Sequence, residues 1–310
     1  MKSGIINVYK EKGWTSSDVV VKLRHLLHEQ KVGHAGTLDP GAQGVLPVCV
    51  GSATQLSEYI MDKKKVYIAQ FIPGITTDTE DITGNVISKT EAEVSLEQVR
   101  EACSHFVGEI KQIPPMYSAV RYNGKKLYEL ARSGRTVERK PRCVTVYSIE
   151  ACRRDDESFT LRVECSKGTY IRTLCSDIGK MLGTGGCMGE LERIACDNFT
   201  AENSHTVGQI ENMIEKGNFG FITDAEAALT KYPAAHLEPS FGVRFLNGVD
   251  AGSKRFAVSE PLKEGSIVRV YIDGRFCAVA QEKNGTLHIR NRFVSPQEYA
   301  EGRGGEAKDE

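Results

Sequence analysis

The first two thirds of the chain alternate between helical and strand spacing of their apolar positions. Residues 15–30 predict a helix, because a Thr-x-x-Asp capping pattern precedes valines and leucines at helical spacing. The apolar run 45–50 and the β-branched, aromatic run 65–72 predict strands, and the polar stretch 74–86 that follows predicts a loop. Residues 95–108 predict a second capped helix, and residues 158–182 predict a strand, a Lys-Gly turn and a helix.

The last part of the chain has a different pattern, with short alternating strands joined by Asp-Gly and Asn-Gly pairs. Both pairs favour hairpin turns, so the stretch from Phe241 to Val294 predicts a small all-β module, a barrel, after a boundary within 231–240. The final residues are polar and lean acidic, which predicts a disordered tail. The predicted division is a core over 1–235, a β module over 236–300 and a tail over 301–310.

Composition narrows the class of protein. Apolar residues make up 40% and charged residues 26% of the chain, as in ordinary globular domains, and no apolar run is long enough to span a membrane. The start lacks the apolar core of a secretory signal, so we expect a cytoplasmic protein. The nine cysteines form no Cys-x-x-Cys pair, which disfavours a disulfide framework or a structural zinc site.

The net charge of −1 conceals one strongly basic segment. Residues 121–142 hold eight Lys or Arg against two Glu. Such a segment is by default a solvated face, but beside an active site it can bind a phosphate backbone. The candidate contacts are Lys125, Lys126, Arg132 and Arg135.

Side chains that could carry chemistry lie beside glycines and turns in four segments. The loop GHAGTLDPGAQG carries Asp39, a predicted strand carries Tyr67, and Tyr170 and Arg172 follow a turn. Leu191 falls on a predicted helix. Each has an ordinary structural explanation alone, such as an Asp-Pro turn or a half-buried strand tyrosine. Together they admit an aspartate nucleophile stabilised by an arginine, with two tyrosines flanking a flat nucleobase.

Five motifs follow one another through residues 4–200. They are GHAGTLDPGAQGVLPVCVG, KVYIAQFIPGITTDTEDITG, IPPMYSAVRYNGKKLYELARSG, SKGTYIRTLCSDIG and LGTGGCMGELERI. In this order they closely resemble the TruB-type tRNA pseudouridine synthases. The β module resembles the PUA or PUA-like RNA-binding domain that often follows this core, mainly through FLNGVDA and its hairpin signals. The resemblance implies an α+β fold, with a long mixed, mainly antiparallel sheet flanked by helices and a small C-terminal β-barrel.

The resemblance also implies roles for single residues. Asp39 is the expected catalytic residue. Tyr67 is expected to stack on the target uracil and to assist the proton that leaves carbon five. Tyr170 and Leu191 are expected to line the pocket, and Arg172 is expected to pair with Asp39.

Two further positions carry expectations from the same resemblance. His34 is expected to fill the place in the RNA that the extruded bases leave. Glu192 stands where the family usually has an arginine, which puts one basic contact near the pocket in doubt but not the chemistry.

The implied reaction is the isomerisation of uridine to pseudouridine in the T loop of tRNA, at position 55. Nothing is added and no electrons are transferred, so the reaction needs no redox cofactor, ATP or metal. The implied partner is the T arm of tRNA, with the basic segment as the candidate for gripping its backbone. The family default is a monomer without a guide RNA or a membrane.

Two other functions stay open from the sequence. One is a guide-RNA-dependent synthase within a multi-protein particle, and the other is a catalytically silent RNA-binding or RNA-folding protein. The short N-terminal lead-in and the helix-rich middle insertion favour the stand-alone enzyme. The intact set of Asp39, Tyr67 and Arg172 argues against a silent protein.

Overall fold

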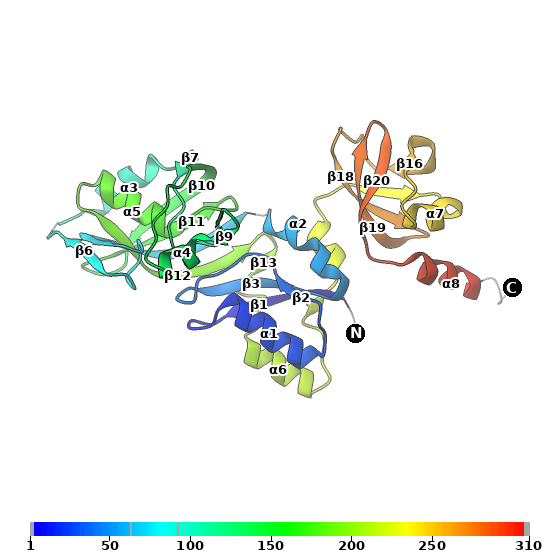
Figure 1. The fold of residues 1–310 in the computed structure, drawn as a ribbon, viewed down its shortest axis with the longest axis horizontal. Coiled ribbons are helices and arrows are strands. Elements are labelled where there is room, and N and C mark those ends of the chain that lie inside the picture. The colour runs from blue at the N-terminus through cyan, green and yellow to red at the C-terminus, as the bar shows by residue number, and fades with distance from the viewer. Residues whose placement is uncertain (1–2, 63, 92, 307–310) are drawn as a thin grey trace.

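Ten strands form one long mixed sheet in the computed structural model, which describes residues 3–62, 64–91 and 93–306 (Figure 1). Its main path runs in the order β14 (Ile222–Thr223), β1 (Gly4–Lys10), β3 (Gln43–Val50), β12 (Gly186–Cys196), β4 (Lys65–Pro73), β11 (Phe159–Cys165), β10 (Arg142–Arg153) and β7 (Gly108–Gln112). Two short strands join it, β2 (Val32–His34) beside β3 and β13 (Phe199–Thr200) beside β12. Among the described strands of this sheet, β12 and β3 pair in parallel and the other pairs are antiparallel. The predicted mainly antiparallel sheet is confirmed.

Helices pack against the two ends of this sheet (Figure 1). At one end α1 and α6 contact each other and the strands β1 and β2, and at the other α3 and α5 contact β10 and β12. The bounds are α1 (Ser16–Leu27), α2 (Ser57–Met61), α3 (Leu96–Ser104), α5 (Ile171–Met181) and α6 (Val207–Glu215), and the 3₁₀ helix η1 (Gly51–Leu56) precedes α2.

Local caps fix where these helices begin and end. Thr15 and Asp18 form the predicted capping box of α1, and Ser95 caps α3 in the same way. Both helices end earlier than predicted. In α1 the cause is His28, which adopts the left-handed conformation with φ 49° and closes the helix after Leu27.

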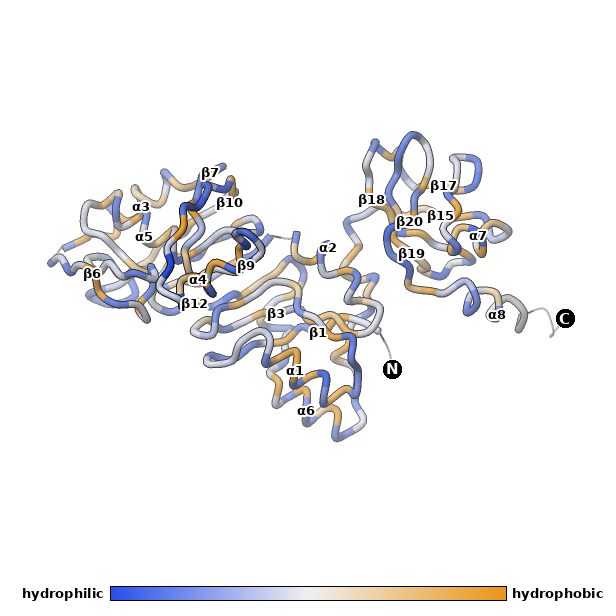
Figure 2. The backbone as a smooth tube through the Cα atoms, viewed as in Figure 1, coloured by the Kyte–Doolittle hydropathy of each residue, from blue (hydrophilic) through white to orange (hydrophobic). Residues whose placement is uncertain are grey.

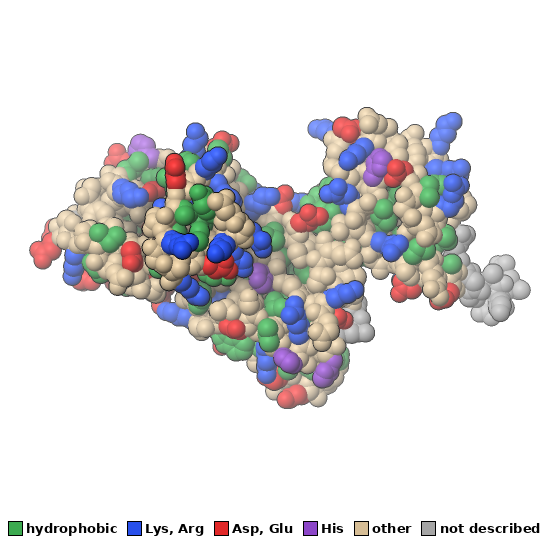
Figure 3. Space-filling model, in the orientation of Figure 1, with side chains coloured by type: hydrophobic (Ala, Val, Ile, Leu, Met, Phe, Trp, Pro, Cys, Tyr) green, Lys and Arg blue, Asp and Glu red, His purple; other side chains and the backbone are tan. Residues whose placement is uncertain are grey.

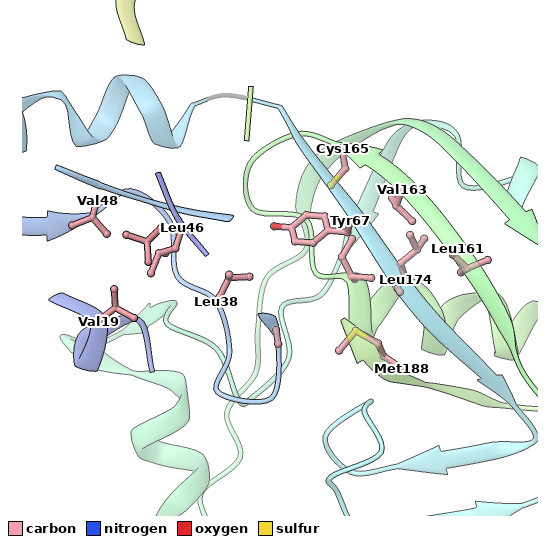
Figure 4. Close-up of a cluster of buried hydrophobic side chains, with 14 of the residues drawn as sticks. Val19, Leu38, Leu46, Val48, Tyr67, Leu161, Val163, Cys165, Leu174 and Met188 are labelled. Atoms are coloured by element: carbon pink, nitrogen blue, oxygen red, sulfur yellow. The ribbon is translucent and has the colours of Figure 1, made fainter. Parts of the chain in front are cut away.

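The core of the sheet is built by alternation along its central strands. On β4 the buried residues Lys65, Tyr67, Ala69 and Phe71 alternate with partly exposed ones, and Ile72 near the end of the strand is also buried. Figure 4 shows Tyr67 reaching from β4 toward Leu38, in the loop that precedes β3. The core thus extends to the segment that carries Asp39.

Two segments of the core have a secondary structure different from the predicted one. Leu191 lies on β12 and not on a helix, because this segment is paired with β4 on one side and β3 on the other. Its helix-like spacing of apolar residues is overridden by these long-range ladders. Part of the predicted loop 74–86 forms a hairpin of β5 (Ile75–Thr77) with β6 (Val86–Lys89).

The C-terminal strands form a separate six-stranded sheet that curls into a nearly closed barrel (Figure 1). Its order is β16 (Ala251–Gly252), β20 (Thr286–Arg292), β19 (Arg275–Lys283), β18 (Ile267–Ile272), β15 (Ala234–Leu237) and β17 (Phe256–Val258). The Asp273-Gly274 and Asn284-Gly285 turns have positive φ at all four residues, as tight hairpin turns require, so both predicted hairpins are confirmed.

A small mixed core joins the barrel to the long sheet. Val279 of β19 belongs to the same buried cluster as Ile5 of β1 and Ile60 of α2. The Tyr59 hydroxyl donates a hydrogen bond of 2.8 Å to the Asn291 side chain of β20. Shorter elements complete this region: η2 (Ala225–Leu229), β14, η3 (Pro239–Phe241), α7 (Gly242–Leu246) and η4 (Ser253–Arg255).

The basic segment 121–142 stands out from the core as a hairpin followed by a helix. Its elements are β8 (Arg121–Tyr122), β9 (Lys125–Lys126) and α4 (Leu127–Arg132). Lys and Arg side chains gather over this region in Figure 3, and Figure 2 shows its hydrophilic backbone near β9. Leu127 and Leu130 anchor α4 by burial.

The C-terminal tail differs in part from its predicted disorder. Helix α8 (Pro296–Glu306) runs through residues 301–306, because Ser295 and Glu298 cap its start reciprocally and Tyr299 is buried against the barrel. Residues 307–310 lie outside the described residues. No helix in the described part of the chain is long and apolar enough to cross a membrane.

Candidate active site

Asp39 lies in the loop between β2 and β3, and hydrogen bonds hold the backbone on both sides of it. The Ser16 hydroxyl accepts from the Leu38 amide at 2.9 Å and lies 3.1 Å from the Leu38 carbonyl, to which it can donate. The Gly13 amide donates to the Pro40 carbonyl at 2.8 Å. The Asp39 side chain itself is 47% exposed. A fixed loop therefore presents this carboxylate to solvent.

Arg172 lies in the first turn of α5 and points its guanidinium at Asp39. This side chain is 8% exposed. One of its terminal nitrogens forms an ion pair with the Asp39 carboxylate, and the other lies 3.3 Å from the Asp81 carboxylate. The structure thus brings together two of the sequence-predicted residues and adds a third charged group.

Asp81 was not singled out by the sequence analysis, which placed it in a polar loop. The loop is fixed against β12 by two backbone bonds, from Ile82 to the Met188 carbonyl at 2.8 Å and from Met188 to the Glu80 carbonyl at 3.0 Å. The Thr77 hydroxyl also donates to the Asp81 carbonyl at 2.7 Å. These contacts bring a second carboxylate to Arg172. In the sequence, the only indication that an acidic side chain of this loop belongs to the site was the acidic run TDTED.

Tyr67 lies directly opposite Arg193 in the register of β4 and β12. Burial raises the pKa of Tyr67 to about 12, while the charge of Arg193 and a hydrogen bond with it act in the opposite direction. The phenol is therefore neutral at neutral pH. Its flat ring lies in the wall of the core and not on the open surface.

Arg193 is fully buried and links Tyr67 to the loop that carries Asp39. Its side chain donates to the Val45 carbonyl at 2.6 Å and to the Gly36 carbonyl at 3.1 Å. Gly44 has φ 107°, and a Cβ there would collide with the Arg193 backbone carbonyl. Sequence reasoning missed Arg193, although it follows Leu191 within the last motif.

A second buried cation holds the far side of the same loop. Lys10 has no exposed surface, and its amine donates to the carbonyls of Glu11, Trp14 and Ala42 at 3.1, 2.7 and 2.6 Å. Burial lowers its pKa to about 8, and the charge of Asp39 opposes this shift. Lys10 was also missed, because a single lysine at the end of an apolar strand is no signal by itself.

Tyr170 occupies the N-cap position of α5, two residues before Arg172. Its backbone amide donates to the Gln112 side chain at 2.9 Å, and its carbonyl accepts from the same side chain at 3.1 Å. Burial raises the pKa of the Tyr170 phenol. The Ser118 hydroxyl and the Arg142 charge oppose this rise, and the Asp39 charge adds to it. Tyr170 and Asp39 therefore lie within electrostatic reach of each other.

His34 and Leu191 lie at the edge of this group. Burial lowers the pKa of His34, and the positive charges of Arg193 and Lys126 add to the effect. Its Nδ1 is buried without a hydrogen-bond partner among the described residues. Leu191 is partly buried on β12, opposite Ala69 of β4.

Of the four basic candidates, Lys126 lies near enough to His34 for their charges to interact. The Arg132 guanidinium packs over the Tyr128 ring at 5.5 Å, and Lys125 and Arg135 are exposed. The structure thus places the basic segment beside the site, with its charges open to solvent (Figure 3).

Glu192 is occupied by a contact of its own. It accepts a hydrogen bond of 2.8 Å from the Tyr9 hydroxyl. Burial and this contact raise the pKa of Tyr9 to about 12. Glu192 therefore links β12 to β1.

The arrangement suits attack by a carboxylate on a flat, neutral ligand. Asp39 supplies an exposed anion, Arg172 fixes its position, and Tyr170 supplies a partly exposed aromatic ring, while the Tyr67 ring lies in the core wall. In the described part of the chain no group of three His, Cys, Asp or Glu side chains could hold a metal ion.

Comparison with known proteins gives consistent matches over most of the chain. Residues 24–171 match the model of the N-terminal domain of TruB family pseudouridylate synthases, and residues 172–230 match a tRNA pseudouridylate synthase B C-terminal domain. A protein of Clostridium kluyveri named tRNA pseudouridine synthase B is 41% identical over 94% of this chain and 99% of its own length. One of the same name from Clostridium tetani is 43% identical over 94% and 100%.

Solved structures show the same fold. The chain is similar to a chain in a crystal structure of a Cbf5–Nop10–Gar1 complex, with a TM-score of 0.75 and 26% identity, over 96% of this chain and 86% of that one. A chain from an archaeal box H/ACA Nop10–Cbf5 complex gives a TM-score of 0.73 at 23% identity, over 96% and 88%.

Proposed function

The chain belongs to the TruB family of pseudouridylate synthases, and from that premise we propose that it isomerises uridine to pseudouridine in the T loop of tRNA, at position 55. The relatives named tRNA pseudouridine synthase B support this substrate. The observation that carries the proposal is the ion pair between the half-exposed Asp39 and the buried Arg172. This ion pair fixes the orientation of the Asp39 carboxylate and leaves the carboxylate open to solvent.

The reaction rearranges bonds within one nucleotide. The bond between N1 of uracil and the ribose breaks, the uracil turns, and its carbon five forms the new bond to the ribose. Carbon five loses a proton and N1 gains one, so the product is an isomer. The Asp39 carboxylate acts as the nucleophile, and it must be an anion whether it attacks the base or the ribose.

The target uridine must leave the stacked loop before it can reach Asp39. Extrusion costs a few kcal/mol, which stacking and hydrogen bonds in the pocket offset. Tyr67 is assigned to stack on the uracil, because its aromatic ring lies in the core wall that extends to Leu38, next to Asp39 (Figure 4). Tyr170 and Leu191 line the pocket. His34, whose Nδ1 lacks a partner among the described residues, fills the place of the extruded bases.

Binding of the T arm is assigned to the basic segment and the barrel. Lys125, Lys126, Arg132 and Arg135 supply positive charge beside the site, which suits the phosphate backbone of a hairpin. The C-terminal barrel acts as a second, PUA-like RNA-binding module. In this division residues 1–235 form the catalytic domain and 236–300 the barrel.

A guide-RNA-dependent enzyme is the alternative that the fold raises, since the similar Cbf5 chains were solved in complexes with other proteins. The relatives named tRNA pseudouridine synthase B are much more similar to this chain, at 41 and 43% against 26 and 23%. We therefore propose a stand-alone monomer in the cytoplasm.

The deciding experiment incubates the purified chain with transcribed tRNA that carries tritium at uracil carbon five. Release of label without guide RNA or partner protein is the expected result, and a transcript with cytidine at position 55 is the matched control. Release only after a guide RNA is added would favour the guide-dependent enzyme. Tight binding of tRNA without release would favour the silent RNA-binding protein.

A further inference from the structure

The chain before the basic segment and the last residue of that segment meet at the edge of the long sheet, beside the active site. Strands β7 and β10 lie side by side (Figure 1), and Gln112, the last residue of β7, pairs with Arg142, the first residue of β10. The chain between them contains the whole hairpin and helix α4. We call the paired ends of β7 and β10 the stem of the basic segment. Within this stem the Gln112 side chain turns inward, and the residue is 1% exposed.

The buried amide of Gln112 makes two hydrogen bonds to the backbone of a single residue. Its oxygen accepts from the Tyr170 amide at 2.9 Å, and its nitrogen donates to the Tyr170 carbonyl at 3.1 Å. Tyr170 is the N-cap of α5, and its own side chain makes no capping hydrogen bond. The Gln112 amide therefore fixes the start of the helix from outside, 58 residues away in the sequence.

The first turn of α5 connects this contact to the active site. The Tyr170 ring and the Arg172 guanidinium, which holds Asp39, both project from this end of the helix. The Ser118 hydroxyl, just before the basic segment, and Arg142, its last residue, also lie close to the Tyr170 phenol. The stem of the segment thus contacts the active site at one residue, through its backbone and its ring.

We propose that Gln112 is a positioning residue, whose amide sets Tyr170 and Arg172 and so couples the stem of the basic segment to the pocket. The inference rests on the proposed function, because it concerns the rate of that reaction. Gln112 has almost no exposed surface, so it acts on the protein backbone and not on RNA.

The chemistry of the two bonds supplies a specific test. A planar group with one acceptor and one donor satisfies both the amide and the carbonyl of Tyr170. In Gln112→Glu, an ionised carboxylate accepts from the amide but repels the carbonyl. A protonated carboxyl group restores both bonds. Burial favours the protonated form of such a carboxyl group, so the change falls at accessible pH.

The experiment measures single-turnover tritium release from tRNA for wild type and Gln112→Glu between pH 5.5 and 8.5. At the upper end we expect the variant to be slower by about tenfold or more, because one buried hydrogen bond is lost and one repulsion is added. The rate of the variant relative to wild type should rise as the pH falls. The tRNA dissociation constant should stay within about twofold of the wild-type value.

Two further variants separate positioning from folding. Gln112→Met has a similar length but neither donor nor acceptor, so its relative rate should be low at every pH. Gln30→Glu, on the exposed surface, should follow wild type throughout. Thermal unfolding of each variant at each pH identifies the range in which it is folded.

The outcomes are distinct. A Gln112→Glu protein that matches wild type at all pH values, or that loses the same activity as Gln112→Met at all pH values, overturns this inference alone. Wild-type protein that releases no label overturns the proposed function and this inference with it.

Discussion

The guanidinium of Arg172 joins two carboxylates that come from separate loops, Asp39 and Asp81. Asp39 is 133 residues away in the sequence. Asp81 is 13% exposed and Asp39 is 47% exposed, so one partner is held within the protein and the other faces solvent. Asp81 therefore holds one terminal nitrogen of the guanidinium, while the other terminal nitrogen stabilises the reactive Asp39 carboxylate.

The first prediction concerns the reactive oxygen. Asp39→Asn should abolish tritium release, because an amide is not a nucleophile for this reaction. Since the Asp39 side chain is half-exposed, the free energy of unfolding should change by less than about 1 kcal/mol. Urea unfolding alongside the activity assay checks both parts. Appreciable turnover by the folded variant would refute the role of Asp39.

The second prediction concerns the carboxylate behind Arg172. Asp81→Asn removes the charge that faces the arginine, and turnover should fall by about tenfold or more as Arg172 loses its fixed position. Asp78→Asn is the matched control, because the Asp78 carboxylate lies in the same loop and accepts hydrogen bonds from Asn85. Equal effects of the two variants on kcat would contradict the prediction.

A third prediction tests the close approach of β3 and β12. Gly44→Ala should lower the free energy of unfolding by about 2–4 kcal/mol, since its Cβ collides with the Arg193 carbonyl at a positive φ. Gly41→Ala, in the loop just before β3, meets open space and should change this free energy by no more than about 0.5 kcal/mol. Urea titrations of both variants give the comparison, and similar midpoints would argue against this packing.

The buried amine of Lys10 predicts a dependence of stability on pH. Its pKa is lowered from 10.5 to about 8, so between these values the folded protein binds fewer protons than the unfolded chain. Wild type should therefore gain stability relative to Lys10→Met as the pH rises from 8 to 10.5. Urea unfolding at several pH values measures this difference, with the exposed Lys12→Met as control. A difference that stays constant would be inconsistent with a buried titrating amine.

The last prediction concerns RNA affinity. Replacing Arg132 and Arg135 together by alanine should weaken tRNA binding. The plot of log binding constant against log salt concentration should become shallower by roughly 1.5, as expected when two phosphate contacts are lost. Replacement of Arg154, in the turn after β10, and Arg162, on β11, is the matched control. An unchanged slope would place the basic segment outside the RNA footprint.

How much of the site the sequence predicts depends on the residue. Asp39, Tyr67, Tyr170 and Arg172 lie in motifs of glycines and turns, and the structure gathers them into one region. Arg193 escaped notice, because neither spacing nor composition indicates that a charge will be buried and hydrogen-bonded to a distant backbone.

By itself the sequence determined the local features of this protein. The cap of α1, the strand pattern of β4 and the two glycine turns of the barrel each depend on interactions within a few residues. Tertiary structure alone decided that the segment of Leu191 is a strand, since β12 is held by ladders to β3 and β4. It also decided that Gln112 and Asp81 reach α5. Contacts between distant segments form only when the whole chain is packed, so no short stretch of sequence encodes them.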